Sequence, residues 1–307
     1  MDILNIIDEI GKIDGEIYER LNPRRKAMRS FFDIGKKLSM AALPVALTGM
    51  FQKAYGQTTV NTTVVSALNL ALALEYLEFN LYNNALTATP TLIPAAAVPI
   101  ITTIRAHEQA HINLLIATIT QLGGVPQAPM PYTAFNYTTI STNVTTNYST
   151  FLRTAMSIED FGVRAYKGQL ANLVSNQSVL AAAAQIHSVE ARHSAQLRKM
   201  IYDLQIANLI NLRPWLSDRA TDAGVVDPTN YNDSAIGALS TVYYQDNATL
   251  LNAENKVTQA GILLTGINGF TDVTANAAAQ SFDEYLLTAT VKTVANALYI
   301  NKPYQLT

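Results

Sequence analysis

Two glutamate–histidine pairs in the sequence have a spacing that suits metal binding. Glu108 and His111 are three residues apart, and so are Glu190 and His193. Residues i and i+3 share one face of an α-helix, with Cβ atoms about 5–6 Å apart, so each pair can direct a carboxylate and an imidazole to the same point. Both groups are ordinary ligands of divalent metal ions. The two pairs therefore predict metal chemistry carried by helices.

A further glutamate precedes each pair at nearly the same distance. Glu75 stands before Glu108, and Glu159 stands before Glu190 with almost the same separation along the chain. The whole set therefore occurs twice, with a nearly constant offset between the two copies. Repeats of apolar positions are common in helical proteins. A repeat that keeps Glu and Glu-x-x-His in register indicates one shared site.

Four carboxylates in one apolar interior need cations. Their neighbours in sequence include Leu72, Leu115 and Ile158, so charge repulsion and desolvation would be costly without positive charge. Two divalent ions neutralise four carboxylates, and two imidazoles complete the ligand set. One Glu from each of two helices and Glu-x-x-His from each of two others is the di-iron or di-manganese carboxylate pattern. The predicted ligands of two divalent ions, with iron favoured over manganese, are Glu75, Glu108, His111, Glu159, Glu190 and His193.

Two other interpretations of these residues stay open at the level of sequence. The glutamates could instead form surface ion pairs with arginines that lie near them in the chain. Those arginines are Arg105, Arg164 and Arg192. His107, Glu108 and His111 also satisfy H-E-x-x-H, a zinc-protease signature. The second copy argues against a protease, because Val189 stands where the first histidine is required. His107 lies about 100° around the helix from Glu108, so we do not count it as a ligand.

A fifth carboxylate lies one helical turn after the first ligand. Glu78 follows Glu75 by three residues. It is either an extra bridging carboxylate, a carboxylate that supports the ligands without binding metal itself, or one partner of a local ion pair. Its counterpart in the repeat is Gly162, so the duplication does not support a role as ligand.

Three more side chains are candidates to support the ligands. Tyr82 and Tyr166 occupy equivalent positions, seven residues after the glutamates of their helices. Their hydroxyls either donate hydrogen bonds to ligand carboxylates or are satisfied elsewhere in the core. His187 lies one turn before Glu190 and is either a neighbour of the ligands or a core histidine.

The helices that carry these residues follow from apolar periodicity and from capping residues. Gly123-Gly124 is a C-terminal cap signal, and Ser175-Asn176 is an N-terminal one. The expected helices span residues 60–86, 95–122, 150–174 and 176–206. Short turns make each consecutive pair antiparallel, and the uncharged segment 123–149 can run the length of a bundle. The predicted fold is all-α, a four-helix bundle made of a duplicated helical hairpin with a long crossover.

Four stretches resemble the bacterial ferritin-like domain family that is related to plant desiccation-associated proteins. They are residues 74–78 (LEYLE), 107–111 (HEQAH), 158–167 (IEDFGVRAYK) and 189–193 (VEARH). The resemblance covers residues 60–205 and continues more faintly near residues 254–261 and 282–284. It implies a ferritin-like four-helix bundle in a protein that is often exported. The length and the C-terminal extension differ from those of cage-forming ferritins, so a 24-subunit shell is not implied.

The composition excludes several classes of function. The chain has 307 residues, no cysteine, four histidines and a formal net charge of −2. Without cysteine there is no disulfide framework, thiolate zinc site, iron–sulfur cluster or cysteine nucleophile. The near-neutral balance argues against nucleic acid as a partner, because phosphate binding needs clustered Lys and Arg.

The N-terminal segment, residues 1–56, is typical of an export signal. Basic residues between Arg24 and Lys37 precede an apolar run from Leu38 to Phe51. A bilayer needs about 20 apolar residues, so this shorter run suits a signal peptide and not a stable transmembrane span. We therefore expect an exported protein, periplasmic or at the cell surface. The alternative is an N-terminal helix that the mature protein retains.

These predictions leave two classes of function. In the first, residues 57–206 form a bundle whose dinuclear iron or manganese centre reacts with O2 or peroxide, as a ferroxidase, a peroxide-consuming enzyme or another oxidase in stress protection. In the second, the protein serves surface assembly or desiccation protection, and the metal site is structural or absent. Residues 207–307 are expected to form a partly irregular, partly helical extension packed on the bundle. Catalytic residues stay unassigned, and a homo-oligomer or a surface assembly is left open.

Overall fold

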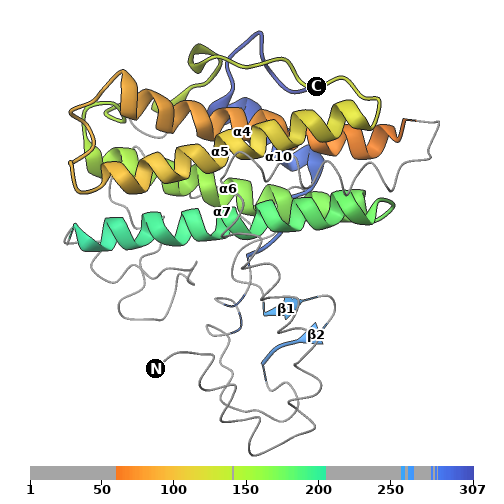
Figure 1. Ribbon diagram of the computed structural model, residues 1–307. Coiled ribbons are helices and arrows are strands. Elements are labelled where there is room, and N and C mark those ends of the chain that lie inside the picture. The colour runs from red at the N-terminus through yellow and green to blue at the C-terminus, as the bar shows by residue number, and fades with distance from the viewer. Residues whose placement is uncertain are drawn as a thin grey trace, which may run out of the picture. The chain divides into compact units, whose positions relative to one another are not determined.

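Four long helices of the described chain lie side by side in two antiparallel pairs (Figure 1). They are α4 (Thr62–Thr87), α5 (Val98–Gln121), α6 (Tyr148–Leu173) and α7 (Gln177–Asp203). This computed structural model describes residues 60–139, 142–204, 257–259, 262–265, 278, 281 and 283–307. All of them belong to one unit of the chain, Phe51–Thr307. The four predicted helices are confirmed, with ends that differ from the expected ones by three residues or fewer.

Three of the four helices begin at an asparagine. The side chains of Asn61, Asn147 and Asn176 each accept a hydrogen bond from the backbone N–H three residues further on, at 3.1, 2.9 and 3.2 Å. Each bond satisfies one of the amides that the first turn of a helix leaves unpaired. α5 has no such cap and carries Pro99 in its first turn instead. It ends before Gly123, whose φ of 75° is the usual helix-terminating conformation.

The lengths of the connections determine how the helices are arranged. Short connections join α4 to α5 and α6 to α7, and each of these pairs is in extensive contact. The connection between α5 and α6 instead runs back along the bundle and includes two short turns (Figure 1). These turns are η1 (Tyr132–Ala134) and η2 (Tyr137–Thr139). The two hairpins meet mainly through α4 and α6, as the predicted duplicated hairpin requires.

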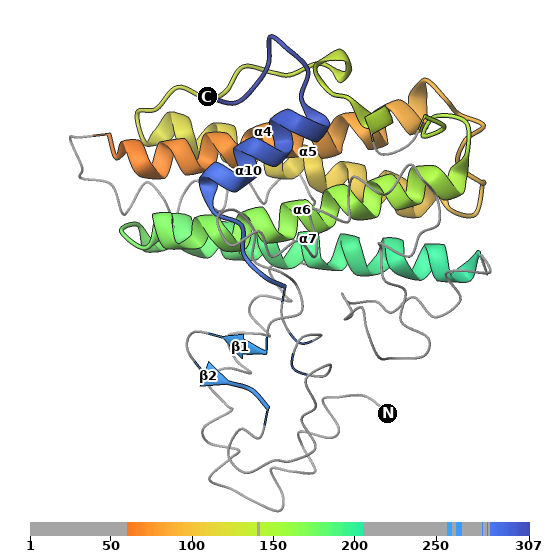
Figure 2. The same cartoon turned by 180° about the vertical axis from the view of Figure 1, so that it is seen from behind.

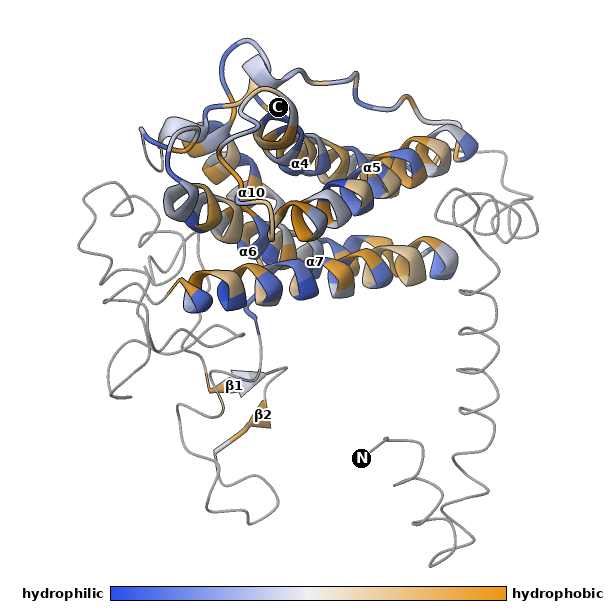
Figure 3. Cartoon of the chain, turned by 60° about the vertical axis from the view of Figure 1, so that its left-hand side comes forward, coloured by the Kyte–Doolittle hydropathy of each residue, from blue (hydrophilic) through white to orange (hydrophobic). Residues whose placement is uncertain are grey.

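The helices pack their apolar faces into a common core. Hydrophobic and hydrophilic residues alternate along α5 and α7 (Figure 3). This pattern is typical of a helix that packs against other helices with one face only. α4 is the most apolar, with an unbroken buried run from Leu70 to Glu78. It is also the one described helix that is long and apolar enough to cross a membrane, with a mean hydropathy of 1.3. Because 72% of that stretch is buried inside the bundle, its composition is explained by its place in the core.

The C-terminal segment packs on α6 and on the crossover. It contains α10 (Thr288–Val294) and the π-helical turn η5 (Ala295–Tyr299), which cross one face of the bundle (Figure 2). The backbone N–H of Leu286 donates to the carbonyl of Arg164 in α6 at 3.0 Å. The N–H of Asn136 donates to the carbonyl of Tyr299 at 2.7 Å. These residues cover the outer side of the α4–α6 contact.

A small two-stranded hairpin was not predicted. β1 (Thr258–Gln259) pairs with β2 (Ile262–Leu263) in antiparallel fashion. Strands of two residues are too short to show the alternating pattern that identifies a strand in a sequence. The export signal at residues 1–56 and the domain boundaries at residues 56 and 206 lie outside the described residues, so they stay predictions.

Candidate metal centre

The six predicted ligands converge near the middle of the four helices. The four glutamate side chains are completely buried, and His111 and His193 are 7% and 4% exposed. α4 and α6 each supply one glutamate, whereas α5 and α7 each supply a glutamate and a histidine. The converging residues are Glu75, Glu108, His111, Glu159, Glu190 and His193. Burial of so many carboxylates is costly unless positive charge accompanies them.

The ring of His111 faces three carboxylates at once. Its Nδ1 atom lies 3.1 Å from Glu75 Oε2, 3.0 Å from Glu108 Oε2 and 2.9 Å from Glu190 Oε1. A ring nitrogen carries one proton or one lone pair, so it cannot satisfy three oxygens. The arrangement is that of ligands directed at a common centre.

The ring of His193 has the equivalent surroundings in the second copy. Its Nδ1 atom lies 2.9 Å from Glu108 Oε1, 3.4 Å from Glu159 Oε2 and 3.3 Å from Glu190 Oε2. The chain repeat therefore reappears in space as two similar sets of ligand atoms around two imidazoles.

These sets overlap and could hold metal ions. The His111 group consists of Glu75, Glu108, His111 and Glu190, and the His193 group consists of Glu108, Glu159, Glu190 and His193. Within each group, one ligand atom per residue lies within 4.8 Å of all the others. Ligand atoms at about 2.1 Å from one octahedral ion are roughly 3 Å apart, which agrees with the nitrogen–oxygen distances above. Glu108 and Glu190 belong to both groups, so each can contribute one oxygen to each side.

Two tyrosines link the hairpins through the outer glutamates. The hydroxyl of Tyr82 in α4 donates to Glu159 Oε1 in α6, and the hydroxyl of Tyr166 in α6 donates to Glu75 Oε1 in α4. Of the two roles left open by the sequence, the structure places both hydroxyls on predicted ligand carboxylates. Each bond occupies one oxygen of a glutamate and leaves the other directed at a histidine. Such contacts orient metal-binding carboxylates.

Burial and mutual charge shift the acidities of the cluster. Burial raises the pKa of Glu75 to about 8, although His111 opposes this, and burial raises the pKa of Glu159 in the same direction. Burial also favours the protonated form of Glu190, but His111 and His193 together lower its pKa. Burial opposes the charged form of His111, yet Glu75 and Glu190 raise its pKa well above 6.5. Protons therefore occupy this site when metal ions do not, and metal binding must displace them.

Several oxygens of the cluster lack a hydrogen-bond partner within the described part of the chain. They are Oε1 of Glu108, Oε2 of Glu159 and Oε1 of Glu190. Imidazole nitrogens lie near all three, but one ring N–H cannot point at several oxygens together. Buried oxygens without partners are rare in folded proteins. Metal ions would satisfy these oxygens and offset the charge of the carboxylates, so the residues present fit a metal site.

The bundle also matches a known family in sequence. Residues 63–203 match the family model of the ferritin-like domain. Residues 63–203 form a ferritin-like domain. The match begins and ends within one residue of α4 and α7, so the domain and the bundle coincide. No curated protein matches the chain.

The ion-pair alternative fails for the arginines near the ligands of the ferritin-like domain. Arg105 donates to Asn83 at 3.3 Å, and Arg192 donates to Ser188 at 3.4 Å. Arg164 donates to the backbone oxygen of Glu284 at 2.9 Å. None of these three contacts is to a predicted ligand, and the glutamates themselves are buried and not on the surface.

The zinc-protease alternative and the candidate His187 also lie apart from the two groups. Of the two histidines of H-E-x-x-H, only His111 belongs to a group, and Glu108 serves both groups. His187 belongs to neither group, and its Nδ1 atom is buried without a hydrogen-bond partner among the described residues. Burial lowers the pKa of His187, against the nearby charge of Asp283.

Glu78 is buried beside the cluster and is not part of a local ion pair. Its side chain is 1% exposed, and neither carboxylate oxygen has a hydrogen-bond partner within the described residues. Gly162 lies directly opposite, where an added Cβ would stand 2.5 Å from Glu78 Oε1. The ion-pair interpretation of Glu78 was therefore wrong, because the residue points into the bundle and not along its surface.

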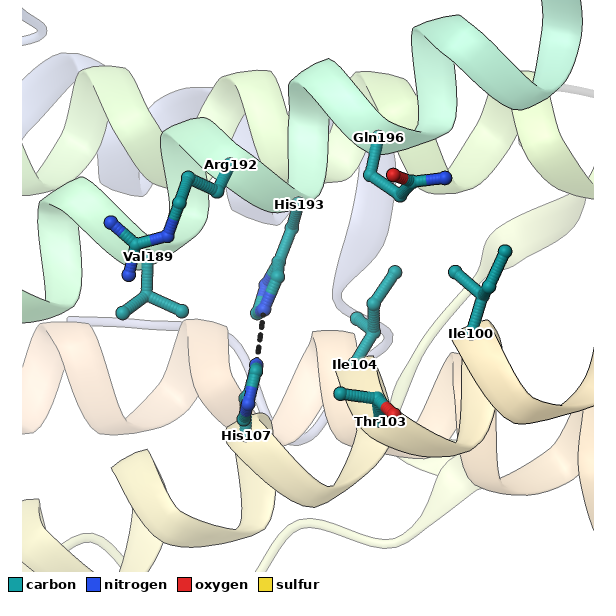
Figure 4. A pocket seen from close by; sticks show the side chains of 8 residues that line it. All are labelled: Ile100, Thr103, Ile104, His107, Val189, Arg192, His193 and Gln196. Atoms are coloured by element: carbon teal, nitrogen blue, oxygen red, sulfur yellow. Dashed lines mark hydrogen bonds between the residues drawn. The ribbon is translucent and has the colours of Figure 1, made fainter. Parts of the chain in front are cut away.

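His107 is the residue at this site whose role the sequence did not indicate. Its Nδ1 atom lies 2.9 Å from Nε2 of His193, and the two rings are nearly parallel (Figure 4). The pair lines a pocket of about 300 Å³ between α5 and α7, together with Arg192 and several apolar side chains. Nδ1 of His193 faces the carboxylates, so a metal ion there would leave the ring proton on Nε2. His107 then accepts that proton's hydrogen bond and fixes the orientation of the ring.

Replacing His107 should weaken one side of the centre. His107→Leu removes the acceptor, and we expect about 10-fold weaker Mn²⁺ binding by the His193 group, as measured by calorimetric titration. His107→Asn keeps an acceptor near the Nδ1 position and should stay close to the wild type. Thr103→Val, in the same pocket, is the control. Equal affinity in all four proteins would show that the contact has no effect on the metal ligand.

Proposed function

We propose that the ferritin-like domain binds two ions of iron or manganese and uses them in reactions with O2 or peroxide. The observation that carries the proposal is that Glu108 and Glu190 belong to both histidine-containing groups. One structural ion needs only one group of four ligands. Two groups joined by two carboxylates suit two ions close together, an arrangement that allows both ions to act on one substrate.

The residues of the chain have distinct tasks in this proposal. Glu108 and Glu190 would help to hold both ions, whereas His111 and His193 would each help to hold one. When bound, two ferrous ions would supply two electrons, which with two protons convert O2 to hydrogen peroxide. Tyr82 and Tyr166 hold Glu75 and Glu159 in place, so that the oxygens facing the histidines stay directed inward. The apolar core around the cluster excludes bulk water and strengthens every charge interaction within it.

The pocket beside His193 offers a small oxidant a route to the centre. His193 is both a wall of this pocket and a member of the His193 group. Ile100, Ile104 and Val189 give the pocket a largely apolar wall, which suits O2 (Figure 4). Its volume of about 300 Å³ is roughly ten times that of a water molecule, so O2 or hydrogen peroxide fits easily.

Oxygen consumption tests the proposal directly. The full chain is loaded with Fe²⁺ without air, desalted and then mixed with air-saturated buffer in an oxygen electrode. We expect O2 uptake well above that of buffer with the same iron. Glu108→Gln combined with Glu190→Gln should reduce uptake to the buffer rate, because both shared carboxylates are lost. Hydrogen peroxide replaces O2 in a parallel run with the Mn²⁺-loaded protein.

The second class of function, a structural metal site, predicts a different result. The loaded protein would then retain its iron and gain stability, but O2 and peroxide would disappear no faster than in buffer. That outcome would overturn the oxidation proposal while leaving the metal site in place. Roles in stress or desiccation, and export through residues 1–56, stay predictions from the sequence.

A further inference from the structure

Glu78 breaks the symmetry of the metal centre. The two hairpins are related by an approximate two-fold axis, since Glu75 and Tyr82 in α4 correspond to Glu159 and Tyr166 in α6 and exchange hydrogen bonds across the α4–α6 contact. The offset that aligns these residues also pairs Glu78 with Gly162. The six predicted ligands and the two tyrosines keep their residue types in both copies, whereas this position does not.

The contact between Glu78 and Gly162 explains the difference. Residues related by a two-fold axis touch each other only when both lie beside the axis. A Cβ atom at position 162 would stand 2.5 Å from Glu78 Oε1, which is closer than real Cβ atoms approach. Two carboxylates could not share this place, whereas one carboxylate opposite a glycine can. The chain thus accommodates a single acidic side chain beside the axis.

A carboxylate in this place faces both halves of the centre. The charges of Glu75, Glu108, Glu159 and Glu190 all act on Glu78, whose pKa burial raises in the first place. Both of its oxygens are buried without a hydrogen-bond partner among the described residues. A buried carboxylate without partners costs stability unless a cation joins it. Neither four-residue group contains Glu78 as it lies, so its side chain must turn toward the ions to reach them.

We propose that Glu78 is a fifth carboxylate of the metal centre, and that it shifts the preference of the site toward trivalent ions. The proposal rests on the dinuclear site proposed above. Four carboxylates already balance two divalent ions, so the charge of Glu78 is surplus beside such a pair. Beside a pair that contains a trivalent ion, the fifth carboxylate balances the additional positive charge. The single glutamate beside the axis thus matches the charge that oxidation of the centre produces.

Redox-inert ions separate the charge effect from catalysis. The full chain and its Glu78→Gln variant are titrated with Zn²⁺ and, in parallel, with Ga³⁺ supplied as its citrate complex. We expect Glu78→Gln to weaken Ga³⁺ binding by about 10-fold or more and to change Zn²⁺ binding by less than about 3-fold. Thr154→Val is the matched control, because Thr154 is also buried in the bundle with an unpartnered side-chain oxygen but bears no charge.

Each other outcome has a defined meaning. Equal loss of both ions in Glu78→Gln, or no loss of either, overturns the proposal for Glu78. Failure of the wild-type chain to bind either ion overturns the dinuclear site itself. The thermal midpoint of the metal-free proteins shows whether folding is affected, and Glu78→Gln is expected to match or exceed the wild type there. Gly162→Ala places a methyl group against Glu78 and should reproduce the selective loss of Ga³⁺ binding.

Discussion

Removal of the metal ions is expected to lower the thermal midpoint of the protein by about 15 °C or more. A ligand present at 1,000 times its Kd stabilises a protein by about 4 kcal/mol per site, so two sites contribute about 8 kcal/mol. For a domain of this size, about 1 kcal/mol shifts the midpoint by roughly 2–4 °C. The metal-free bundle must also keep these buried carboxylates without metal ions. Calorimetric scans of the loaded protein before and after chelation measure the difference.

The same comparison should depend on pH in a defined direction. Burial raises the pKa of Glu75 from 4.5 to about 8, so in this range the folded metal-free protein holds a proton that the unfolded chain releases. The stability of the metal-free protein therefore falls as the pH rises from 4.5 to 8. Burial opposes the charged form of His111 and His193, but the carboxylates of the cluster raise the pKa of both. The stability of the metal-free protein therefore falls further as the pH rises above 6.5.

Metal binding has the opposite dependence, because the ions must displace those protons. The midpoint difference between loaded and chelated protein should therefore be larger at pH 8 than at pH 6. Glu108→Gln combined with Glu190→Gln is the control, and chelation should leave its midpoint unchanged. A difference that is absent, or that is larger at pH 6, would contradict the assignment of these residues as ligands.

Loss of Arg198 should destabilise the bundle by about 3–5 kcal/mol, or roughly 10 °C in thermal midpoint. Its guanidinium group in α7 donates to both oxygens of Asp160 in α6, at 2.7 and 2.5 Å. The side chains are 4% and 2% exposed, and Ser194 hydrogen-bonds both. Arg198→Ala would leave the buried Asp160 carboxylate without this arginine. Asp160 directly follows the predicted ligand Glu159 in α6. Equilibrium unfolding in denaturant measures the loss.

The neighbouring residue supplies a matched control for this prediction. Lys199 pairs with Asp203 at 2.6 Å, but these side chains are 60% and 54% exposed. Exposed pairs contribute at most about 1 kcal/mol, so Lys199→Ala should be nearly silent. Replacing both Arg198 and Asp160 by apolar residues of similar size should recover much of the loss, since no charge is then left without a partner. Equal effects of Arg198→Ala and Lys199→Ala would refute the buried pair.

The ligand set was accessible to sequence reasoning because its spacing is local and repeated. Glu-x-x-His fixes two side chains on one face of a helix whatever its neighbours are. The duplication then identified Glu75 and Glu159 as equivalent ligands, one in each copy. The cap at Asn176 and the long crossover were predictable for a similar reason, since each can be recognised from one continuous segment of the chain.

Contacts between helices were less accessible. His107 was excluded as a ligand from its angle on α5 alone, and nothing in α5 indicates that His193 of α7 approaches it. The role of Glu78 stayed open because the repeat pairs it with Gly162, and a repeat does not show that equivalent residues beside an axis touch each other. The Asp160–Arg198 pair likewise joins two helices, so no spacing within either one predicts it.

Metal content is the most direct test of the dinuclear site. The full chain is loaded with Fe²⁺ or Mn²⁺ without air, desalted and analysed by plasma mass spectrometry, beside Glu108→Gln combined with Glu190→Gln as the variant. We expect two ions per wild-type chain and none in the variant, with both proteins folded. Equal metal content in the two proteins, or no metal retained by the wild type, would contradict it.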